Sequence, residues 1–127
     1  MAKAGEDQVN RLLCDVRKAI EENRCSLVSR EKNMATLAHF GWRLSEVKEE
    51  LSNLTYSNYV SGPEIDRAEP KSDNLWIFKS YIDRTPIYIK LKVKYQTDSR
   101  VVIISFHISD QHTELAVFLN LKIILLF

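Results

Sequence analysis

Cysteine is scarce in this chain, which has only Cys14 and Cys25 among its 127 residues. The two form no Cys-x-x-Cys pair and could not brace a small secreted domain with a disulfide framework. No charged-then-apolar leader opens the chain at Met1. We therefore expect reduced thiols and a cytoplasmic protein.

The chain also lacks a clustered set of metal ligands and a strong charge of one sign. His39, His107 and His112 are not spaced as a metal-binding set with the cysteines, so we expect neither a metal nor a cofactor. The formal net charge is only +1. A nucleic-acid-binding function would therefore depend on where the charges lie, and six basic residues against two acids occur from Lys79 through Arg100.

No apolar run is long enough to span a bilayer comfortably, although the end of the chain is very apolar from Leu115 to Leu119 and from Ile123 to Phe127. With 45% hydrophobic residues, the chain is long enough for one packed core. We expect a single domain over residues 1–112 and an apolar extension over residues 113–127. The extension could pack on the domain, anchor at an interface, mediate self-association or be foreign to the domain; no membrane partner is expected.

Helical patterns fill the first half of the chain. Apolar residues recur at helical spacing from Gln8 to Asn23, and a second helix is expected from Arg30 to Phe40, ending at Gly41. Ser26-Leu27-Val28 is a short extended piece between them. A third helix should start with Ser45 as N-cap and bury one stripe of residues, namely Leu44, Val47, Leu51 and Leu54.

The segment from Trp76 to Ile108 predicts a three-stranded antiparallel sheet. Asp83–Pro86 and Gln96–Ser99 are rich in turn residues and interrupt β-branched and aromatic runs. Turns centred between Arg84 and Thr85, and between Thr97 and Asp98, set the expected register. The expected pairs are Trp76 with Val93, Phe78 with Leu91, Ile82 with Ile87, Leu91 with Ile104, Ile89 with Phe106, and Ile87 with Ile108.

This alternation gives the sheet two different faces. We predict an α+β fold in which the N-terminal amphipathic helices pack on the apolar face, which carries Trp76, Phe78, Leu91 and Phe106. The opposite face, called the open face below, carries Lys79, Tyr81, Tyr88, Lys90, Lys92, Ser105 and His107. Lys79 is expected opposite Lys90, a repulsion that a bound anion would relieve, although solvent alone can accommodate lysines whose ends splay apart.

A loop of about 19 residues is expected from Thr55 to Asp73, longer than most connections in compact domains. Gly62 and Pro63 favour a defined turn within it, and Tyr59 offers an aromatic ring on which a base could stack. The loop is interpreted either as flanking a substrate or as an exposed connector.

Five segments, in this order, resemble MqsR-type toxins over roughly residues 8–108. They are Arg30-Glu31-Lys32-Asn33, Asn58-Tyr59-Val60-Ser61-Gly62-Pro63-Glu64, Leu75-Trp76-Ile77-Phe78, Tyr88-Ile89-Lys90-Leu91 and Ile104-Ser105-Phe106-His107. The resemblance implies a RelE-like fold and a toxin of a bacterial type II toxin-antitoxin system. Such toxins are small ribonucleases that cut messenger RNA without a metal and are held inactive by an antitoxin.

The resemblance also implies site residues. The family's Tyr-x-Lys strand matches Tyr88 and Lys90, and the basic residue after its last Ser-Phe pair matches His107. Where the best-known member has Gln and Lys, this chain has Ile77 and Val60. Lys79 is expected to supply the missing polar contact, because it lies two residues from Ile77 on the same face.

Metal-free cleavage of RNA needs a base, an acid and stabilisation of negative charge. We assign His107 as general acid, Tyr88 as general base or positioning hydroxyl, and Lys79 with Lys90 as the phosphate clamp; the roles of Tyr88 and His107 could be exchanged. The expected RNA-binding residues are Tyr59, Tyr81, Lys92, Arg84 and Ser105, and the expected partners are single-stranded messenger RNA and an antitoxin. The competing interpretation is a binding domain whose basic sheet face docks RNA or an acidic protein without cutting it.

Overall fold

The structure, a computed structural model, describes residues 3–95 and 99–109. The predicted extension over residues 113–127 lies outside these ranges. Within them the elements are α1 (Glu6–Glu21), β1 (Cys25–Leu27), α2 (Glu31–Phe40), α3 (Leu44–Ser52), a 3-10 turn η1 (Tyr56–Asn58), β2 (Tyr59–Glu64), β3 (Leu75–Ile82), β4 (Thr85–Lys94) and β5 (Arg100–Ile108). The α+β prediction is confirmed, and the helices precede most of the sheet in sequence.

The sheet is larger than predicted, and it is mixed. Its strand order in the described part of the chain is β1-β5-β4-β3-β2. The three predicted strands β3, β4 and β5 are antiparallel neighbours, but β1 joins β5 in parallel and β2 joins β3 on the other side. The prediction of a purely antiparallel sheet is therefore wrong. Short strands far from their partners in sequence leave too weak a pattern to be recognised as strands.

The predicted register between β3 and β4 is also wrong, by two residues. Trp76 pairs with Leu91, Phe78 with Ile89 and Ile82 with Thr85. Asp83 and Arg84 form the two-residue turn, and both have positive φ angles, of 48° and 68°, as a type I′ hairpin requires. The turn centre thus lies one residue earlier than predicted. Because the side-chain period is two, a slip of two residues keeps every side chain on its predicted face.

The register between β4 and β5 matches the prediction at one end only. Ile87 pairs with Ile108 and Ile89 with Phe106, as predicted, but Leu91 pairs with Ile103 rather than with Ile104. A bulge after the Lys90–Ser105 pair places one extra residue on β5. Bulges bend a strand and re-aim its side chains, and they are common beside functional sites.

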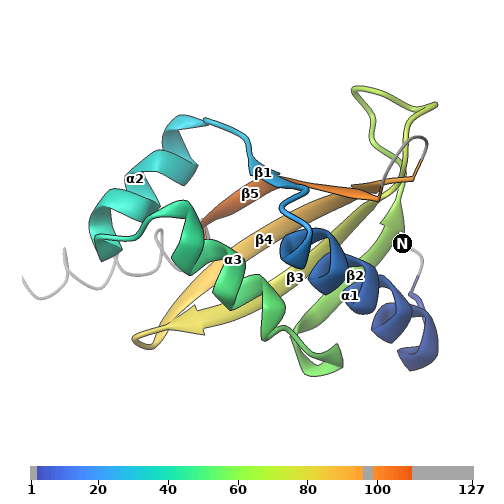
Figure 1. The fold of residues 1–127 in the computed structure, drawn as a ribbon, viewed down its shortest axis with the longest axis horizontal. Coiled ribbons are helices and arrows are strands. Elements are labelled where there is room, and N and C mark those ends of the chain that lie inside the picture. Colours follow the sequence, from blue (N-terminus) through green and yellow to red (C-terminus); the bar gives the residue numbers. More distant parts are fainter. Residues whose placement is uncertain (1–2, 96–98, 110–127) are drawn as a thin grey trace, which may run out of the picture.

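The helices pack on the apolar face of the sheet, as predicted (Figure 1). The core joins buried residues of α1 and α3 to those of the strands, including Leu13, Val16, Val47, Leu51, Phe78, Ile89, Leu91 and Phe106. Helix α1 runs two residues ahead of its predicted range. Helix α2 ends at Gly41, whose φ of 66° is left-handed as expected. Helix α3 begins after Arg43, not at Ser45, because Glu46 accepts a hydrogen bond from the Arg43 backbone N–H.

The predicted loop over Thr55–Asp73 is partly structured, so that prediction was too simple. It begins with η1 and β2, and β2 pairs irregularly with β3. Gly62 is required there: its φ is 121°, and a Cβ on it would lie 2.7 Å from the carbonyl oxygen of Leu75. The remaining connector, residues 65–74, leaves the sheet and returns to β3.

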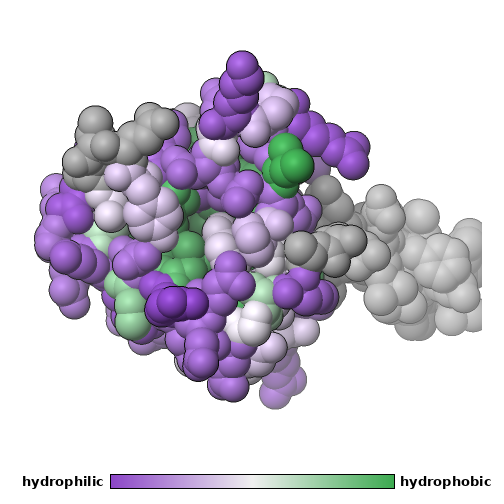
Figure 2. Space-filling view, turned by 90° about the vertical axis from the view of Figure 1, so that its right-hand side faces the viewer, coloured by the Kyte–Doolittle hydropathy of each residue, from purple (hydrophilic) through white to green (hydrophobic). Residues whose placement is uncertain are grey.

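Most of the surface shown in Figure 2 is hydrophilic, with apolar colour in only a few places. Among the residues that the structure describes, the exposed large hydrophobic ones come from several elements. No helix within residues 3–95 and 99–109 has both the length and the apolar character needed to cross a membrane.

Candidate active site

Four side chains form a square on the open face, where β4 and β5 pair. Tyr88 lies opposite His107, and Lys90 lies opposite Ser105. Opposed Cβ atoms are about 5 Å apart, and neighbours on the same strand and face are about 7 Å apart. The square is therefore of the size of a phosphodiester group with its flanking oxygens, and it is defined below by these four residues.

Tyr88 and His107 are in ring contact across the square. Their ring centroids are 5.5 Å apart, and the planes are inclined by 33°. Lys90 Nζ lies 5.9 Å from the centroid of the Tyr88 ring, within the range of a cation–π interaction. A phenol, an imidazole and an ammonium thus share one small area, as the sequence predicted.

The hydrogen bond of His107 determines its tautomer. Nδ1 lies 2.9 Å from the carbonyl oxygen of Ile108, and a carbonyl oxygen can only accept. Nδ1 therefore carries a hydrogen and donates it, which leaves Nε2 as the atom that can take up or release a proton. His107 is only 8% exposed, so little of its ring is accessible from solvent.

Lys79 and Tyr81 continue the open face on β3. Lys79 pairs with Tyr88 and not with Lys90, so the predicted repulsion between two opposed lysines is absent. Its Nζ lies 5.5 Å from the centroid of the Tyr81 ring, and Tyr81 is 61% exposed. Lys90 instead lies opposite Ile77, which is buried.

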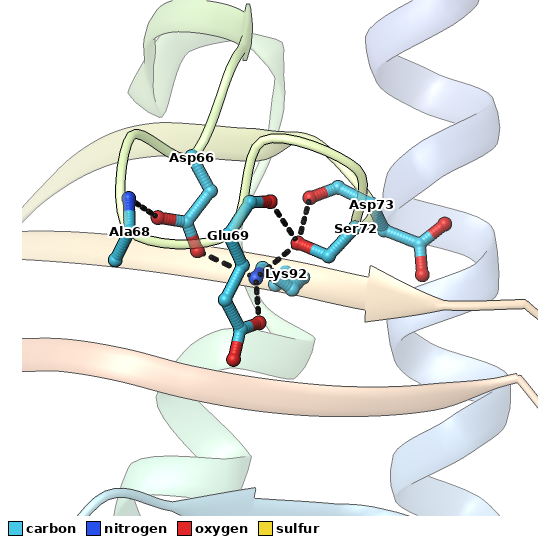
Figure 3. A network of polar contacts seen from close by, with 6 residues as sticks. All are labelled: Asp66, Ala68, Glu69, Ser72, Asp73 and Lys92. Carbon is cyan, nitrogen blue, oxygen red and sulfur yellow. Dashed lines mark hydrogen bonds and ion pairs between the residues drawn. The ribbon is translucent and has the colours of Figure 1, made fainter.

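Lys92 lies on the open face, but its side chain is bonded to residues of the connector 65–74 (Figure 3). Its Nζ is 2.6 Å from Asp66 Oδ2, 3.3 Å from Glu69 Oε2 and 2.8 Å from Ser72 Oγ. The residue is only 3% exposed. In this arrangement Lys92 anchors the connector over one end of the face, and its ammonium is already bonded to three side chains; its role in RNA binding stays a prediction.

These ion pairs shift the proton affinities of their members. The hydrogen bond from Lys92 lowers the pKa of Asp66, helped by the backbone N–H of Ala68. Burial by itself lowers the pKa of Lys92, but the hydrogen bonds to Asp66 and Glu69 outweigh burial and raise the pKa above its ordinary value. Both shifts favour the charged forms, so the anchor persists across the neutral range.

Two predicted RNA-binding residues lie away from the square. Tyr59 pairs with Phe78, so its ring lies on the helix-covered side, where it contacts Tyr56, Trp76 and Phe78. Its hydroxyl accepts from the Ala4 N–H and donates to the Gly62 carbonyl. Arg84 lies at the tip of the β3–β4 turn, about 13 Å along the strand from Tyr88.

Sequence reasoning assigned no role to the residues that begin α2, although they include one of the resembling segments. Asn33 is fully buried, and its amide donates to the carbonyls of Val28 and Ile104 while its Oδ1 accepts from the Phe106 N–H. Thr36 accepts from the Ile108 N–H. These side chains take the place of a strand along the edge of β5 beyond β1, and they support the bulge beside the square.

Within the part of the chain that the structure describes, no three His, Cys, Asp or Glu residues gather as a potential metal site. In the comparisons with known proteins, no family model matches the chain, and no curated protein or solved structure is significantly similar to it. An inference about function therefore has to come from the geometry of the open face and from the resemblance of the five segments.

Proposed function

We propose that the chain is a metal-independent endoribonuclease of the MqsR type, a toxin that cleaves messenger RNA and thereby inhibits translation. The observation that carries this proposal is the contact between Tyr88 and His107, 5.5 Å between centroids, with Lys90 against Tyr88 and Lys79 paired to it. Two proton-transfer groups and two cations on one open face are what RNA cleavage without a metal needs. The mixed sheet with helices on one face supports a RelE-like fold.

The reaction starts from the 2′-hydroxyl of the nucleotide before the cut. This oxygen attacks the adjacent phosphorus, a P–O2′ bond forms, and the P–O5′ bond breaks to give a cyclic phosphate and a free 5′-hydroxyl. Tyr88, ionised to the phenolate, accepts the proton of the 2′-hydroxyl, or as a neutral hydroxyl it orients the 2′-hydroxyl while water takes the proton. His107 in its imidazolium form gives the proton on Nε2 to the departing O5′ and becomes neutral. A histidine suits this role because an imidazole can both release and take up a proton.

Lys79 and Lys90 stabilise the negative charge that builds up on the phosphorane oxygens. Preorganised cations are effective because they need no reorganisation during the reaction. Tyr81 extends the face next to Lys79 and is exposed enough for a base to stack on it. Single-stranded RNA is the expected substrate, since paired bases could not reach such a ring.

A second function, binding without cleavage, is favoured by one observation. His107 is 8% exposed and donates Nδ1–H within its own strand, as a histidine with a structural role would. In that case the open face would be a basic platform for RNA or an acidic protein, and the imidazole would take no part in chemistry.

Cleavage of a defined messenger RNA in excess EDTA, with products mapped at nucleotide resolution, separates the two functions. We expect discrete cuts by the wild type and none by His107→Ala. His39→Ala is the matched control, because His39 is an exposed histidine on α2. Equal cutting by His107→Ala and wild type, or RNA binding without any cutting, would favour the second function.

A toxin of this kind is expected to work in the cytoplasm and to be held by an antitoxin that covers the open face or a neighbouring sheet edge. Growth arrest on expression, relieved by a protein encoded next to it, is the corresponding cellular test.

A further inference from the structure

Arg30 brings a guanidinium to the corner of the square from a different element. It is the N-cap residue of α2, and its Nη1 donates a hydrogen bond to Ser105 Oγ over 3.4 Å. Ser105 is one corner of the square and lies directly opposite Lys90. A residue 75 positions away in sequence therefore reaches the same area as Tyr88 and His107.

The position of Arg30 is stabilised independently of its side chain. Its backbone N–H donates to Val28, and its carbonyl accepts from the Met34 N–H. Asn33, one turn later, ties the same end of α2 to β5 through hydrogen bonds with Ile104 and Phe106, and it makes a third hydrogen bond to the Val28 carbonyl. The start of α2 is thus held against β5, while the Arg30 side chain itself is exposed.

The chemistry of the group suits an anion. A guanidinium has five N–H donors in a fixed planar fork, so the bond from Nη1 to Ser105 orients the fork while further donors can meet a ligand. Arginine forks match the paired oxygens of a phosphate. Lys90 lies about 5 Å from Ser105 at Cβ, so a phosphate over the square could contact both cations.

We propose that Arg30 is a phosphate-binding residue of this site, oriented by Ser105, and that it contacts the non-bridging oxygens of the phosphodiester being cleaved. This inference rests on the proposed ribonuclease function and adds a third cation to Lys79 and Lys90. It also assigns a role to the segment that opens α2.

The test combines cleavage with the salt dependence of binding. An oligoribonucleotide with a 2′-O-methyl group at the mapped cut site is used for binding, and the unmodified one for cleavage. We expect Arg30→Ala to slow cleavage about 10–100-fold and to reduce the slope of log affinity against log salt by about 0.7, the share of one phosphate contact. Arg30→Lys should keep the slope but recover only part of the rate.

Arg11→Ala, which removes an exposed arginine of α1, is the matched control and should change neither quantity. A merely structural role for Arg30 would lower thermal stability and leave the salt slope as in the wild type, and this result would overturn the inference. If the wild type cleaves RNA and Arg30→Ala changes neither the rate nor the slope, the inference about Arg30 is overturned and the proposed function stands. If the wild type neither cleaves nor binds RNA, the proposed function is overturned together with the inference.

Discussion

At the residue scale, the open face is defined by hydrogen bonds as much as by charges. His107 has its tautomer set by the Ile108 carbonyl, and Ser105 accepts from Arg30. Lys92, two residues from Lys90 on the same face, forms ion pairs with Asp66 and Glu69. Three lysines that look equivalent in sequence therefore differ in their surroundings: Lys90 belongs to the square and Lys79 pairs with Tyr88 beside it, whereas Lys92 is held by the connector.

Removing one oxygen tests the role of Tyr88. In Tyr88→Phe we expect RNA affinity to be retained and cleavage to fall about 10²–10⁴-fold, the usual contribution of a positioned acid or base. Single-turnover cleavage and filter binding measure the two quantities. Tyr81→Phe is the matched control, since a ring used for stacking does not need its hydroxyl; comparable losses in the two variants would argue against a proton-transfer role for Tyr88.

At the element scale, the open face of the sheet is bordered by two segments that are not strands. The start of α2 completes the edge of β5 beyond β1 through Asn33 and Thr36. On the other side, the connector 65–74 is anchored over the face by Lys92. The square lies between these two supports.

Loss of the Asn33 side chain should weaken the β5 edge. Asn33→Ala removes the partner of the Phe106 N–H and of the Ile104 carbonyl, whereas the Val28 carbonyl keeps its bond from the Arg30 N–H. Each orphaned buried group costs about 1–3 kcal/mol. We expect the urea midpoint to fall by the corresponding amount with little change in the slope of unfolding free energy against urea. Asn10→Ala, at an exposed position of α1, should have no such effect, and a similar midpoint for both variants would show that the edge does not depend on Asn33.

Release of the connector is expected when Lys92 loses its charge. Lys92→Met removes the donor for Asp66, Glu69 and Ser72, and the two acids can return to water. Trypsin should then cut faster at Arg67 and Lys71, which are exposed within the connector, because local opening exposes the chain to proteolysis. Lys94→Met, on the same strand and exposed, is the control; unchanged cutting in Lys92→Met would mean that other contacts hold the connector.

The same anchor should respond to pH. The pKa of Asp66 is lowered from 3.8 by its hydrogen bond from Lys92, so its contribution is present above pH 3.8 and is lost as the pH falls below it. The pKa of Lys92 is raised above 10.5, so its contribution is lost only at higher, strongly alkaline pH. We expect hydrogen-exchange protection of the Ala68 N–H, which donates to Asp66, to disappear in acid before the core amides open. Simultaneous loss of both would argue against a local anchor.

At the scale of the whole molecule, the two faces of the sheet differ in character. The helices and the apolar side of the sheet form one core, and the open face carries the polar groups at the β4–β5 pairing. The division is not complete, because Lys92, Ser105 and His107 are buried although they belong to the open face. The thermal stability of the His107 variant is therefore measured beside its cleavage rate.

The amino-acid sequence by itself determined which residues lie on which face. Strand alternation has a period of two, so the two faces of β3 and β4 were assigned correctly although their register was off by two residues. In β5 the assignment holds only as far as the bulge, beyond which Ile103 takes the core position predicted for Ile104. The helical repeat of α1 and the glycine that ends α2 are equally local signals. Such features depend on neighbours in the chain and can be read without knowing the fold.

Only the tertiary structure decided which residues of the open face come together. The parallel pairing of β1, the bulge in β5, the reach of Arg30 to Ser105 and the capture of Lys92 by the connector all join residues distant in sequence. Such contacts depend on how whole elements pack, and no local propensity encodes them. The sequence therefore indicated a basic face with a tyrosine and a histidine, and the packing of α2 and the connector selected which of its cations remain beside them.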